Sequence, residues 1–241
     1  MKRIEYNAEQ KSGAWFRLRC GIPTASAFKN FITPKGKPAA NETRENYLAD
    51  LVAERMTGKL PQGFVTDAMQ RGIDLEPKAR RWYKMETGRM VREVGFIMRE
   101  GLPRCGYSPD GIVDADGDAT ERLVEIKIPE DRAMVRRLLD GDISNYLLQM
   151  QAGMWIADVP VCDLVLFTDT PGLCNRIIEV RADPELHESF ATIVAEFCAE
   201  LDAAEAQLIG MGAEKQELQG SDEAAEKTMD SMEPLPTGEG R

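Results

Sequence analysis

Residues 105–129, CGYSPDGIVDADGDATERLVEIKIP, form the stretch from which the fold of this chain is predicted. Runs rich in Val, Ile, Leu and Tyr stand on both sides of residues 115–118, which contain an Asp-Gly pair. An Asp-Gly pair between apolar runs is a strong signal for a β-hairpin. We therefore expect two antiparallel strands here, with the rest of the chain arranged around them.

The hairpin is expected to bring charged side chains together. Because side chains alternate faces along a strand, Glu125 and Lys127 point one way, while Val124 and Ile126 point into a core. Asp110 lies on or next to the preceding strand, and the hairpin folds it back toward Glu125. Carboxylate oxygens are suitable ligands for a hard cation such as Mg²⁺. The stretch therefore predicts metal-assisted phosphodiester chemistry.

The tripeptide Glu-x-Lys carries little information by itself, because it occurs three times, at Glu9, Glu76 and Glu125. A charged pair on the polar face of a hairpin is most often a solvated surface pair. Only the third copy follows Ser-Pro-Asp (108–110) at hairpin distance, with apolar residues around the charges on both strands. This context favours the functional interpretation over the surface pair.

A long helix is predicted to begin at Thr66 or Asp67 and to end at Gly88. Pro77 lies inside it, where a proline removes a hydrogen bond and bends the helix. The bend follows Glu76 directly and would aim this carboxylate. The alternative is that Pro77 only starts a second helix, at a favourable first-turn position.

Residues 15–32 indicate an anion site. Thr24 or Ser26 is suited to cap a short helix, and the free N–H groups of such a terminus attract phosphate. Arg19, just before it, would add a bidentate phosphate contact. The alternative is that Arg19 is an ordinary surface residue, which is the commoner case.

The remaining segments complete an α/β (α+β) fold with a central mixed sheet flanked by helices. Further helices are predicted at 47–57, 130–140, 142–155 and 183–201, strands at 91–99, 162–167 and 176–180, and an exposed basic loop at 33–43. We expect one domain over residues 1–211. Residues 212–241 are polar, acidic and poor in aromatic residues, which predicts a disordered tail.

The composition argues against several classes of protein. The five cysteines are widely spaced without a C-x-x-C pair, which argues against a disulfide framework and a zinc site. The single histidine, His187, falls in a predicted helix and gives little support to serine–histidine hydrolysis. Because no apolar run is long enough to span a bilayer and no signal pattern is present, we expect a soluble intracellular protein.

The net charge of −11 is unusual for a protein that binds nucleic acid, which normally shows a basic patch. Its distribution matters more than its sum, because eight acidic and three basic residues give the tail a charge of −5. Basic residues cluster elsewhere, at 17–19, 29–37, 71–81 and 132–137. A positive channel on an acidic body is compatible with this pattern.

Several motifs occur in a fixed order along the chain. They are W-x-x-L-R-x-G-x-x-T-A-S at 15–26, G-x-x-x-E at 72–76, S-P-D-G at 108–111, E-x-K at 125–127 and Y-x-x-Q-x-Q-x-x-M-W at 146–155. Each motif is common, but the ordered set is not. With this set, residues 15–201 resemble the lambda exonuclease group of viral recombination nucleases, within the PD-(D/E)xK superfamily. The resemblance implies a core like that of restriction endonucleases.

The resemblance also implies an activity. It is that of a processive exonuclease, which digests the 5′-ended strand of linear double-stranded DNA in the 5′-to-3′ direction and leaves 3′ overhangs for recombination by strand annealing. Two Mg²⁺ ions per site are implied, and Mn²⁺ would also support activity. The implied assembly is a ring-shaped homotrimer threaded by DNA. It would be encoded by a phage or prophage, act in the host cytoplasm and work with a single-strand annealing recombinase.

The resemblance assigns roles to individual positions of this sequence. The implied metal ligands are Glu76, Asp110, Glu125 and the main-chain carbonyl of Ile126. The side chains that would serve the attacking water are Lys127 and Gln149. The implied pocket for the terminal 5′ phosphate consists of Arg19, Ser26 and Ser108. Met69 would separate the terminal base pair, and the candidate duplex contacts are Lys35, Lys37 and Arg71.

Two alternatives to this function stay open. One is an endonuclease or a repair nuclease of the RecB type, which belongs to the same superfamily. The other is a non-catalytic scaffold that binds DNA ends for recombination. A covalently closed DNA circle separates an end-requiring enzyme from an endonuclease, and metal-dependent release of nucleotides separates an enzyme from a scaffold.

Overall fold

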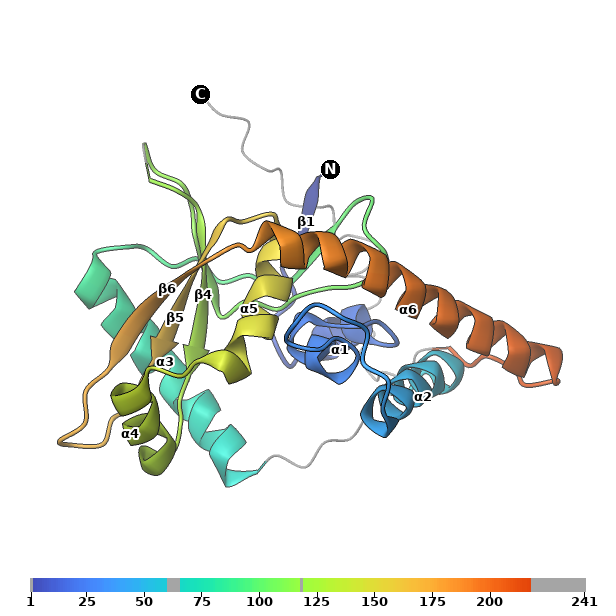
Figure 1. Cartoon of the computed structure of the whole chain (residues 1–241), viewed down its shortest axis with the longest axis horizontal. Helices are drawn as coiled ribbons and strands as arrows, with labels where there is room; N and C mark the ends of the chain where they lie inside the picture. The colour runs from blue at the N-terminus through green and yellow to red at the C-terminus, as the bar shows by residue number, and fades with distance from the viewer. Residues whose placement is uncertain (1, 60–65, 118, 218–241) are drawn as a thin grey trace.

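The computed structural model describes residues 2–59, 66–117 and 119–217, and a four-stranded sheet forms its centre. Its strands stand in the order β3 (Gly111–Val113), β4 (Arg122–Lys127), β5 (Val161–Leu166) and β6 (Arg176–Arg181) (Figure 1). β4 and β5 are parallel, whereas the other two neighbouring pairs are antiparallel. The predicted α+β class with a central mixed sheet is therefore confirmed.

β3 and β4 form the predicted hairpin, in which Gly111 lies opposite Val124 and Val113 opposite Arg122. The connection is longer than the tight turn that an Asp-Gly pair normally makes, because strand pairing stops at Val113. Gly117 has a φ of 57° and lies in this loop rather than between paired strand ends. The predicted hairpin is confirmed, and a loop connects its two strands.

The chain crosses over the sheet between β4 and β5, as a parallel pair requires. The crossover consists of α4 (Asp131–Asp140) and α5 (Ser144–Ala157). The backbone N–H of Ser144 donates to the Asp142 carboxylate at 2.9 Å, which fits the predicted start of this helix. Residues 150–157 of α5 are all buried, so this helix passes through the interior of the molecule.

Helices cover both faces of the sheet. α3 (Asp67–Thr87) packs against the face that carries Val124 and Ile126. Its buried residues follow one stripe at four-residue spacing, Leu75, Ala79 and Tyr83. The opposite face packs against α5 and its neighbours in the larger of the two cores. β4 is therefore buried on both sides, including the side that carries Glu125.

α3 begins and ends at the predicted residues. The backbone N–H of Met69 donates to the Thr66 hydroxyl at 3.2 Å, and Gly88 ends the helix with a φ of 72°. Pro77 lies inside one continuous helix, so the alternative that it starts a second helix is wrong. Met69 is 58% exposed and lies outside the buried stripe of this helix.

A separate two-stranded ribbon consists of β1 (Arg3–Tyr6) and β2 (Phe96–Arg99). The sequence predicts a strand over residues 91–99, but only the last four of them form β2. Arg92 makes an isolated bridge to Ile112 instead. β1 is not predicted at all, because its short run RIEY has too little apolar alternation to be recognised.

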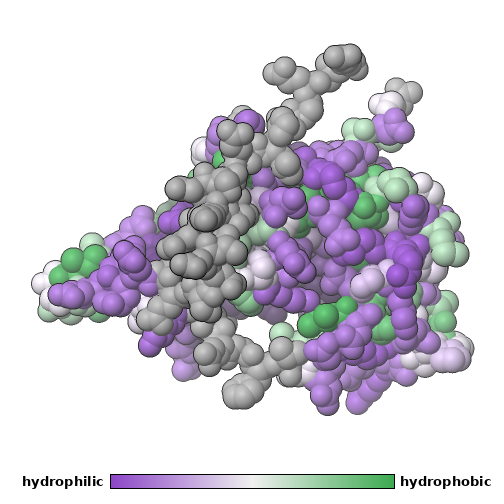
Figure 2. Space-filling view, turned by 180° about the vertical axis from the view of Figure 1, so that it is seen from behind, coloured by the Kyte–Doolittle hydropathy of each residue, from purple (hydrophilic) through white to green (hydrophobic). Residues whose placement is uncertain are grey.

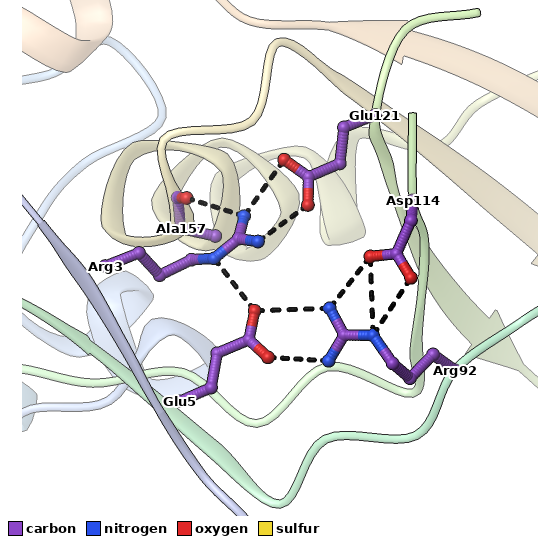
Figure 3. A network of polar contacts seen from close by, with 6 residues as sticks. All are labelled: Arg3, Glu5, Arg92, Asp114, Glu121 and Ala157. Carbon is purple, nitrogen blue, oxygen red and sulfur yellow. Dashed lines mark hydrogen bonds and ion pairs between the residues drawn. The ribbon is translucent and has the colours of Figure 1, made fainter. Parts of the chain in front are cut away.

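A network of five charged residues, which we call the Glu5 network, ties this ribbon to the main sheet (Figure 3). It consists of Arg3, Glu5, Arg92, Asp114 and Glu121. Arg92 contacts Glu5 at 2.6 Å and Asp114 at 2.9 Å. Arg3 contacts Glu5 at 2.9 Å and Glu121 at 2.7 Å. Each acid of the network therefore contacts a guanidinium directly.

α1 (Gly13–Arg19) and the short 3-10 helix η1 (Ala25–Asn30) follow β1. Thr24 stands directly before η1, but its side chain makes no capping hydrogen bond, so the predicted cap is wrong. The start of η1 is held by backbone instead, because the N–H of Ala25 donates to the carbonyl of Gly106 at 3.0 Å.

Two further helices complete the larger core. α2 (Glu42–Thr57) begins earlier than predicted, because Asn41 caps it by accepting from the N–H of Arg44 at 3.0 Å. α6 (Pro184–Gly210) begins at the predicted Asp183 cap and continues past the predicted end at 201. Its far end carries the exposed residues Leu208 and Ile209. In Figure 2 the projection at the left shows hydrophobic and hydrophilic residues side by side at its end.

The acidic tail is described only in part. Residues 212–217 are exposed and form neither helix nor strand. The backbone N–H of Gln216 donates to the carbonyl of Met56 at the end of α2, at 2.8 Å. The disorder predicted for the tail concerns mainly residues 218–241, which lie outside the described residues.

Among the described residues, no helix has the length and apolar character needed to cross a membrane.

Candidate active site

Asp110 lies directly before β3 and turns back onto β4, as the sequence predicts. Its Oδ2 atom accepts a hydrogen bond from the backbone N–H of Ile126 at 2.6 Å. Burial raises the pKa of the Asp110 carboxyl well above its usual value, and the negative charges of Glu125 and Glu76 raise it further. The carboxyl therefore lies in a place where negative charge is concentrated and where a cation would be stabilised.

Glu125 is held from three sides, with only 2% of its surface exposed. Oε2 accepts from the Tyr107 hydroxyl at 2.7 Å. Oε1 accepts from Lys127 Nζ at 2.7 Å and from Gln149 Nε2 at 2.5 Å. The alternative of a solvated surface pair is wrong, because the carboxylate lies in the interior.

Tyr107 was not predicted as part of this site. Burial raises the pKa of its hydroxyl well above the usual value, and Glu125 raises it further, so the hydroxyl remains a hydrogen-bond donor. Tyr107 pairs with Ile97 of β2 and packs closely against α5, because a Cβ on Gly153 would lie 2.8 Å from its ring. The signal in the sequence was its place three residues before Asp110.

Lys127 remains charged in this environment. Burial by itself would lower the pKa of the ammonium, but the carboxylates of Glu125 and Asp110 outweigh burial and raise this pKa above its usual value. Nζ also lies 3.2 Å from Gln149 Oε1 and 5.6 Å from the centre of the Tyr146 ring. Lys127 is therefore suited to donate hydrogen bonds and to offset negative charge, and not to accept a proton.

Glu76 reaches the site from α3. Its Oε1 accepts from Arg80 Nη2 at 2.7 Å, one helical turn further on. Arg80 also donates from Nε to the main-chain carbonyl of Asp110 at 3.2 Å, and so joins α3 to the hairpin. Glu76, Arg80 and Asp110 line a cavity of about 340 Å³. Arg80 was not predicted, although the Glu-x-x-x-Arg spacing was visible.

Glu76, Asp110, Glu125, Arg80 and Lys127 are called the Asp110 group below. Among the described residues, no three Asp, Glu, His or Cys side chains already stand in the arrangement of a metal site. The chemistry of the donors nevertheless fits Mg²⁺, which prefers carboxylate and carbonyl oxygens. Among the described residues, the Asp110 carboxylate contacts a backbone N–H but no cationic side chain. Its pKa is raised mainly by burial and then by Glu125, although the charge of Lys127 acts in the opposite direction.

The residues of the predicted phosphate pocket also lie together. Arg19 Nη1 donates to the Ser108 hydroxyl at 3.2 Å, and Nη2 lies 3.5 Å from the Thr24 hydroxyl. That hydroxyl is 3.5 Å from the hydroxyl of Ser26. Burial lowers the pKa of the Arg19 guanidinium, and among the described residues no carboxylate forms an ion pair with it. A half-buried cation without a carboxylate partner is suited to bind an anion.

Trp15 holds this arginine in place and was not assigned a role from the sequence. The Arg19 guanidinium lies 4.2 Å from the centre of the Trp15 ring. Nε1 of Trp15 donates to the Ser108 hydroxyl at 2.8 Å and approaches the carbonyl of Gly95 at 3.0 Å. Because the Ser108 oxygen already accepts two hydrogen bonds, its own O–H is available to donate to an anion.

The candidate DNA-contacting residues do not join this group. Met69 is 58% exposed in the first turn of α3, as a residue that meets DNA would be. Lys35 and Lys37 are exposed in a loop that packs against the start of α6. Arg71 donates to the carbonyl of Pro129 at 3.2 Å. Among the described residues, none of the four contacts the carboxylates of the site.

Comparisons with known proteins identify the family of this chain. Residues 14–160 match the family model of the YqaJ-like viral recombinase domain. The crystal structure of an alkaline exonuclease from Laribacter hongkongensis has 34% sequence identity and a TM-score of 0.74, and the match covers 84% of this chain and 98% of that one. The same enzyme in complex with dAMP gives the same values.

A phage-related exonuclease from Haemophilus somnus 129PT shares the fold at 16% identity, with a TM-score of 0.55 and coverage of 79% of this chain and 96% of that one. The search of curated proteins gave no match. The family model and the alkaline exonuclease, each matched over most of this chain, support a nuclease role. The chain thus belongs to the family of proteins with a YqaJ-like viral recombinase domain.

Proposed function

We propose that the protein is a Mg²⁺-dependent exonuclease that digests the 5′-ended strand of linear double-stranded DNA in the 5′-to-3′ direction. The observation that carries this proposal is the pairing of two sites. Among the described residues, the half-buried Asp110 carboxylate contacts no cationic side chain, and the half-buried Arg19 guanidinium contacts no carboxylate. Ser108 belongs to the second site and stands two residues from Asp110. A DNA strand end with its metal ions would supply cations to Asp110 and an anion to Arg19.

The proposed metal ligands are the carboxylates of Glu76, Asp110 and Glu125 and the main-chain carbonyl of Ile126. Bound there, two Mg²⁺ ions would stabilise charge on the attacking and leaving oxygens and lower the pKa of a bound water. Mn²⁺ would serve in the same way. Glu125 would exchange part of its contact with Lys127 and Gln149 for the metal, and Glu76 part of its contact with Arg80.

Lys127 and Gln149 are the proposed partners of the attacking water. Both reach the same oxygen of Glu125, at 2.7 and 2.5 Å, so a water beside that oxygen would be within hydrogen-bonding range of all three. Because Lys127 remains charged, it would orient the water and offset charge. Lys127→Arg is expected to lose most hydrolysis, since a guanidinium has a different donor geometry. Full activity in this variant would contradict the positioning role.

Arg19, Ser108 and Ser26 are the proposed pocket for the 5′ phosphate. A guanidinium and two hydroxyls are common donors to phosphate oxygens. The relative from Laribacter hongkongensis was solved with dAMP, a 5′ mononucleotide, which is the kind of product that this direction of digestion would release. Met69, Lys35, Lys37 and Arg71 remain proposed DNA contacts, and Met69 the proposed wedge between the terminal bases.

We further propose a ring-shaped homotrimer that acts processively and passes its 3′ overhangs to a single-strand annealing recombinase in the host cytoplasm. An enclosed duplex cannot leave easily, so processive digestion would be compatible with a net charge of −11. Size-exclusion chromatography with light scattering measures the assembly. A monomer would contradict the ring.

The test of the function is a digestion assay with linear and covalently closed circular duplexes side by side. We expect release of mononucleotides from the linear DNA with Mg²⁺, none with a chelator, and an intact circle. Cutting of the circle would support the endonuclease alternative. Binding of ends without release of nucleotides would support the scaffold alternative.

A further inference from the structure

A second cavity lies beside Lys127 and Gln149. Its volume is about 310 Å³. Besides Lys127 and Gln149 it is lined by residues of η1, α4 and α5, among them Lys29, Arg137 and Tyr146. It is therefore a pocket of ligand size that shares a wall with the proposed water-positioning pair.

The charge of this cavity is positive. Lys29, Lys127 and Arg137 line it, and no acidic side chain is among its described lining residues. In contrast, the cavity at Glu76 and Asp110 contains acidic side chains. The charge of Lys127 is offset by Glu125 at 2.7 Å, so Lys29 and Arg137 are the two cations of this pocket that an anion would pair with.

Arg137 is available for such an anion. Among the described residues its one side-chain hydrogen bond runs from Nη1 to the carbonyl of Ala133 in its own helix, at 3.0 Å. Its Nε is buried and makes no hydrogen bond. A guanidinium has five N–H donors, so Arg137 keeps donors that could bind an anion in the cavity.

Tyr146 gives the pocket an aromatic wall. The Arg137 guanidinium lies 4.9 Å and Lys127 Nζ 5.6 Å from the centre of its ring, so the ring fixes the cations at the rim. Asn145 adds an amide to the lining. Cations for a phosphate, together with an aromatic ring and an amide for sugar and base, are the groups that recognise a nucleotide.

Ser26 connects this cavity with the phosphate pocket, because it lines both this cavity and the one that contains Arg19. We propose that the cavity is a second nucleotide subsite, which holds a phosphate-bearing nucleotide of the digested strand through Lys29 and Arg137. This subsite deepens the proposed function and rests on it. It assigns a binding role to four residues, Lys29, Arg137, Asn145 and Tyr146.

The test is calorimetric titration of the full chain with dAMP in the absence of divalent ions, and with deoxyadenosine as the phosphate-free control. The variant Arg19→Ala serves as background, because it removes binding at the first phosphate pocket. Adding Arg137→Gln to this background should weaken dAMP binding about tenfold, as expected when a charge-assisted contact is lost. Adding Lys29→Gln should weaken it about threefold. Because Lys29 is exposed, this change does not disturb the core.

The matched control is Arg136→Gln in the same background, since Arg136 is the exposed neighbour in α4 and does not line this cavity. It should leave dAMP binding unchanged. Equal loss of dAMP affinity in the Arg136 and Arg137 variants would overturn the subsite. The absence of dAMP binding in the Arg19→Ala background would also overturn it. The same holds if deoxyadenosine binds as tightly as dAMP. Because no DNA or metal enters this titration, its result is independent of whether linear duplex is digested.

Discussion

The Glu5 network and the Asp110 group each combine three acidic with two basic side chains, but the charges are distributed differently. In the Glu5 network every acid contacts a guanidinium, and the hydrogen bond from Arg92 lowers the pKa of Asp114 (Figure 3). In the Asp110 group, Arg80 contacts Glu76 and Lys127 contacts Glu125, while the carboxylate of Asp110 contacts neither cation and has a raised pKa.

This difference indicates that the Asp110 group, and not the Glu5 network, is suited to bind a cation. Satisfied ion pairs join β1, the segment before β2 and the hairpin, and contribute to the fold. A half-buried acid such as Asp110, without a cationic partner, destabilises the folded chain unless a cation binds to it. A strongly raised pKa in a cavity is accordingly a marker of a functional site. The following predictions test this contrast.

The largest effect is expected from Asp110→Asn. It should lower the digestion of linear duplex at least about a thousandfold, because a lost metal ligand removes several kcal/mol of transition-state stabilisation. Asp114→Asn is the matched control, because the same change on the same hairpin should leave the rate nearly unchanged. Initial rates of nucleotide release measure both. Comparable losses in the two variants would contradict the contrast.

Asp110→Asn should also leave the metal-free protein at least as stable as the wild type. A folded-state pKa raised above the unfolded value means that ionised Asp110 costs the folded state stability at neutral pH, a cost that disappears as the pH falls through the folded-state pKa. The asparagine keeps an acceptor for the N–H of Ile126 and removes this cost. Denaturant unfolding at pH 7 with a chelator provides the measurement.

Glu5→Gln should have the opposite effect on stability. Glu5 is 8% exposed and contacts both Arg3 and Arg92, so the loss of its charge should lower the free energy of unfolding by about 2–3 kcal/mol. The protein that remains folded should digest DNA at the wild-type rate. A lower rate of DNA digestion at unchanged stability would instead show that the Glu5 network has a functional role.

Arg19→Ala tests whether a cation without a carboxylate partner marks function in the same way. Wild-type protein should digest 5′-phosphorylated ends about tenfold faster than 5′-hydroxyl ends, since a charge-assisted contact to phosphate is worth about 1.5–3 kcal/mol. The variant should digest both ends at the slower rate. Equal wild-type rates on the two ends would remove the phosphate pocket.

The smallest effect concerns the pH dependence of the Glu5 network. The pKa of Asp114 is lowered in the folded state, so its contribution to stability is present above the usual Asp pKa and lost as the pH falls through the lower folded value. Because this side chain is 58% exposed, Asp114→Asn should cost less than about 1 kcal/mol at pH 7. The gap to the wild type in denaturant unfolding should close below about pH 4.

The sequence correctly predicts those elements that depend on residues close together in the chain. α3 was predicted to its last residue, because Thr66 caps it and Gly88 ends it. The hairpin followed from alternation, and it placed Asp110 beside β4. The burial of Glu125 was not visible, because it depends on Tyr107 and α5 closing over the outer face of β4.

Contacts between distant segments were the main source of error. The strand predicted over 91–99 is interrupted where Gly95 passes the backbone of Ala8, since a Cβ there would lie 1.8 Å from the Ala8 carbonyl oxygen. The 3-10 helix η1 begins on a backbone bond to Gly106 rather than on a hydroxyl cap. Arg80 donates to the carbonyl of Asp110, and Trp15 donates to the hydroxyl of Ser108. No local pattern in the sequence reveals these two contacts.

The Asp110 carboxylate contacts no cationic side chain among the described residues, and we expect the Asp110 group to bind divalent ions there. Calorimetric titration of the full chain with Mn²⁺ at pH 7, without DNA, measures this property directly. The wild type and Asp114→Asn should bind the ion alike, and Asp110→Asn should bind it at least about a hundredfold more weakly. Equal affinity in all three proteins, or no binding to the wild type, would contradict the account.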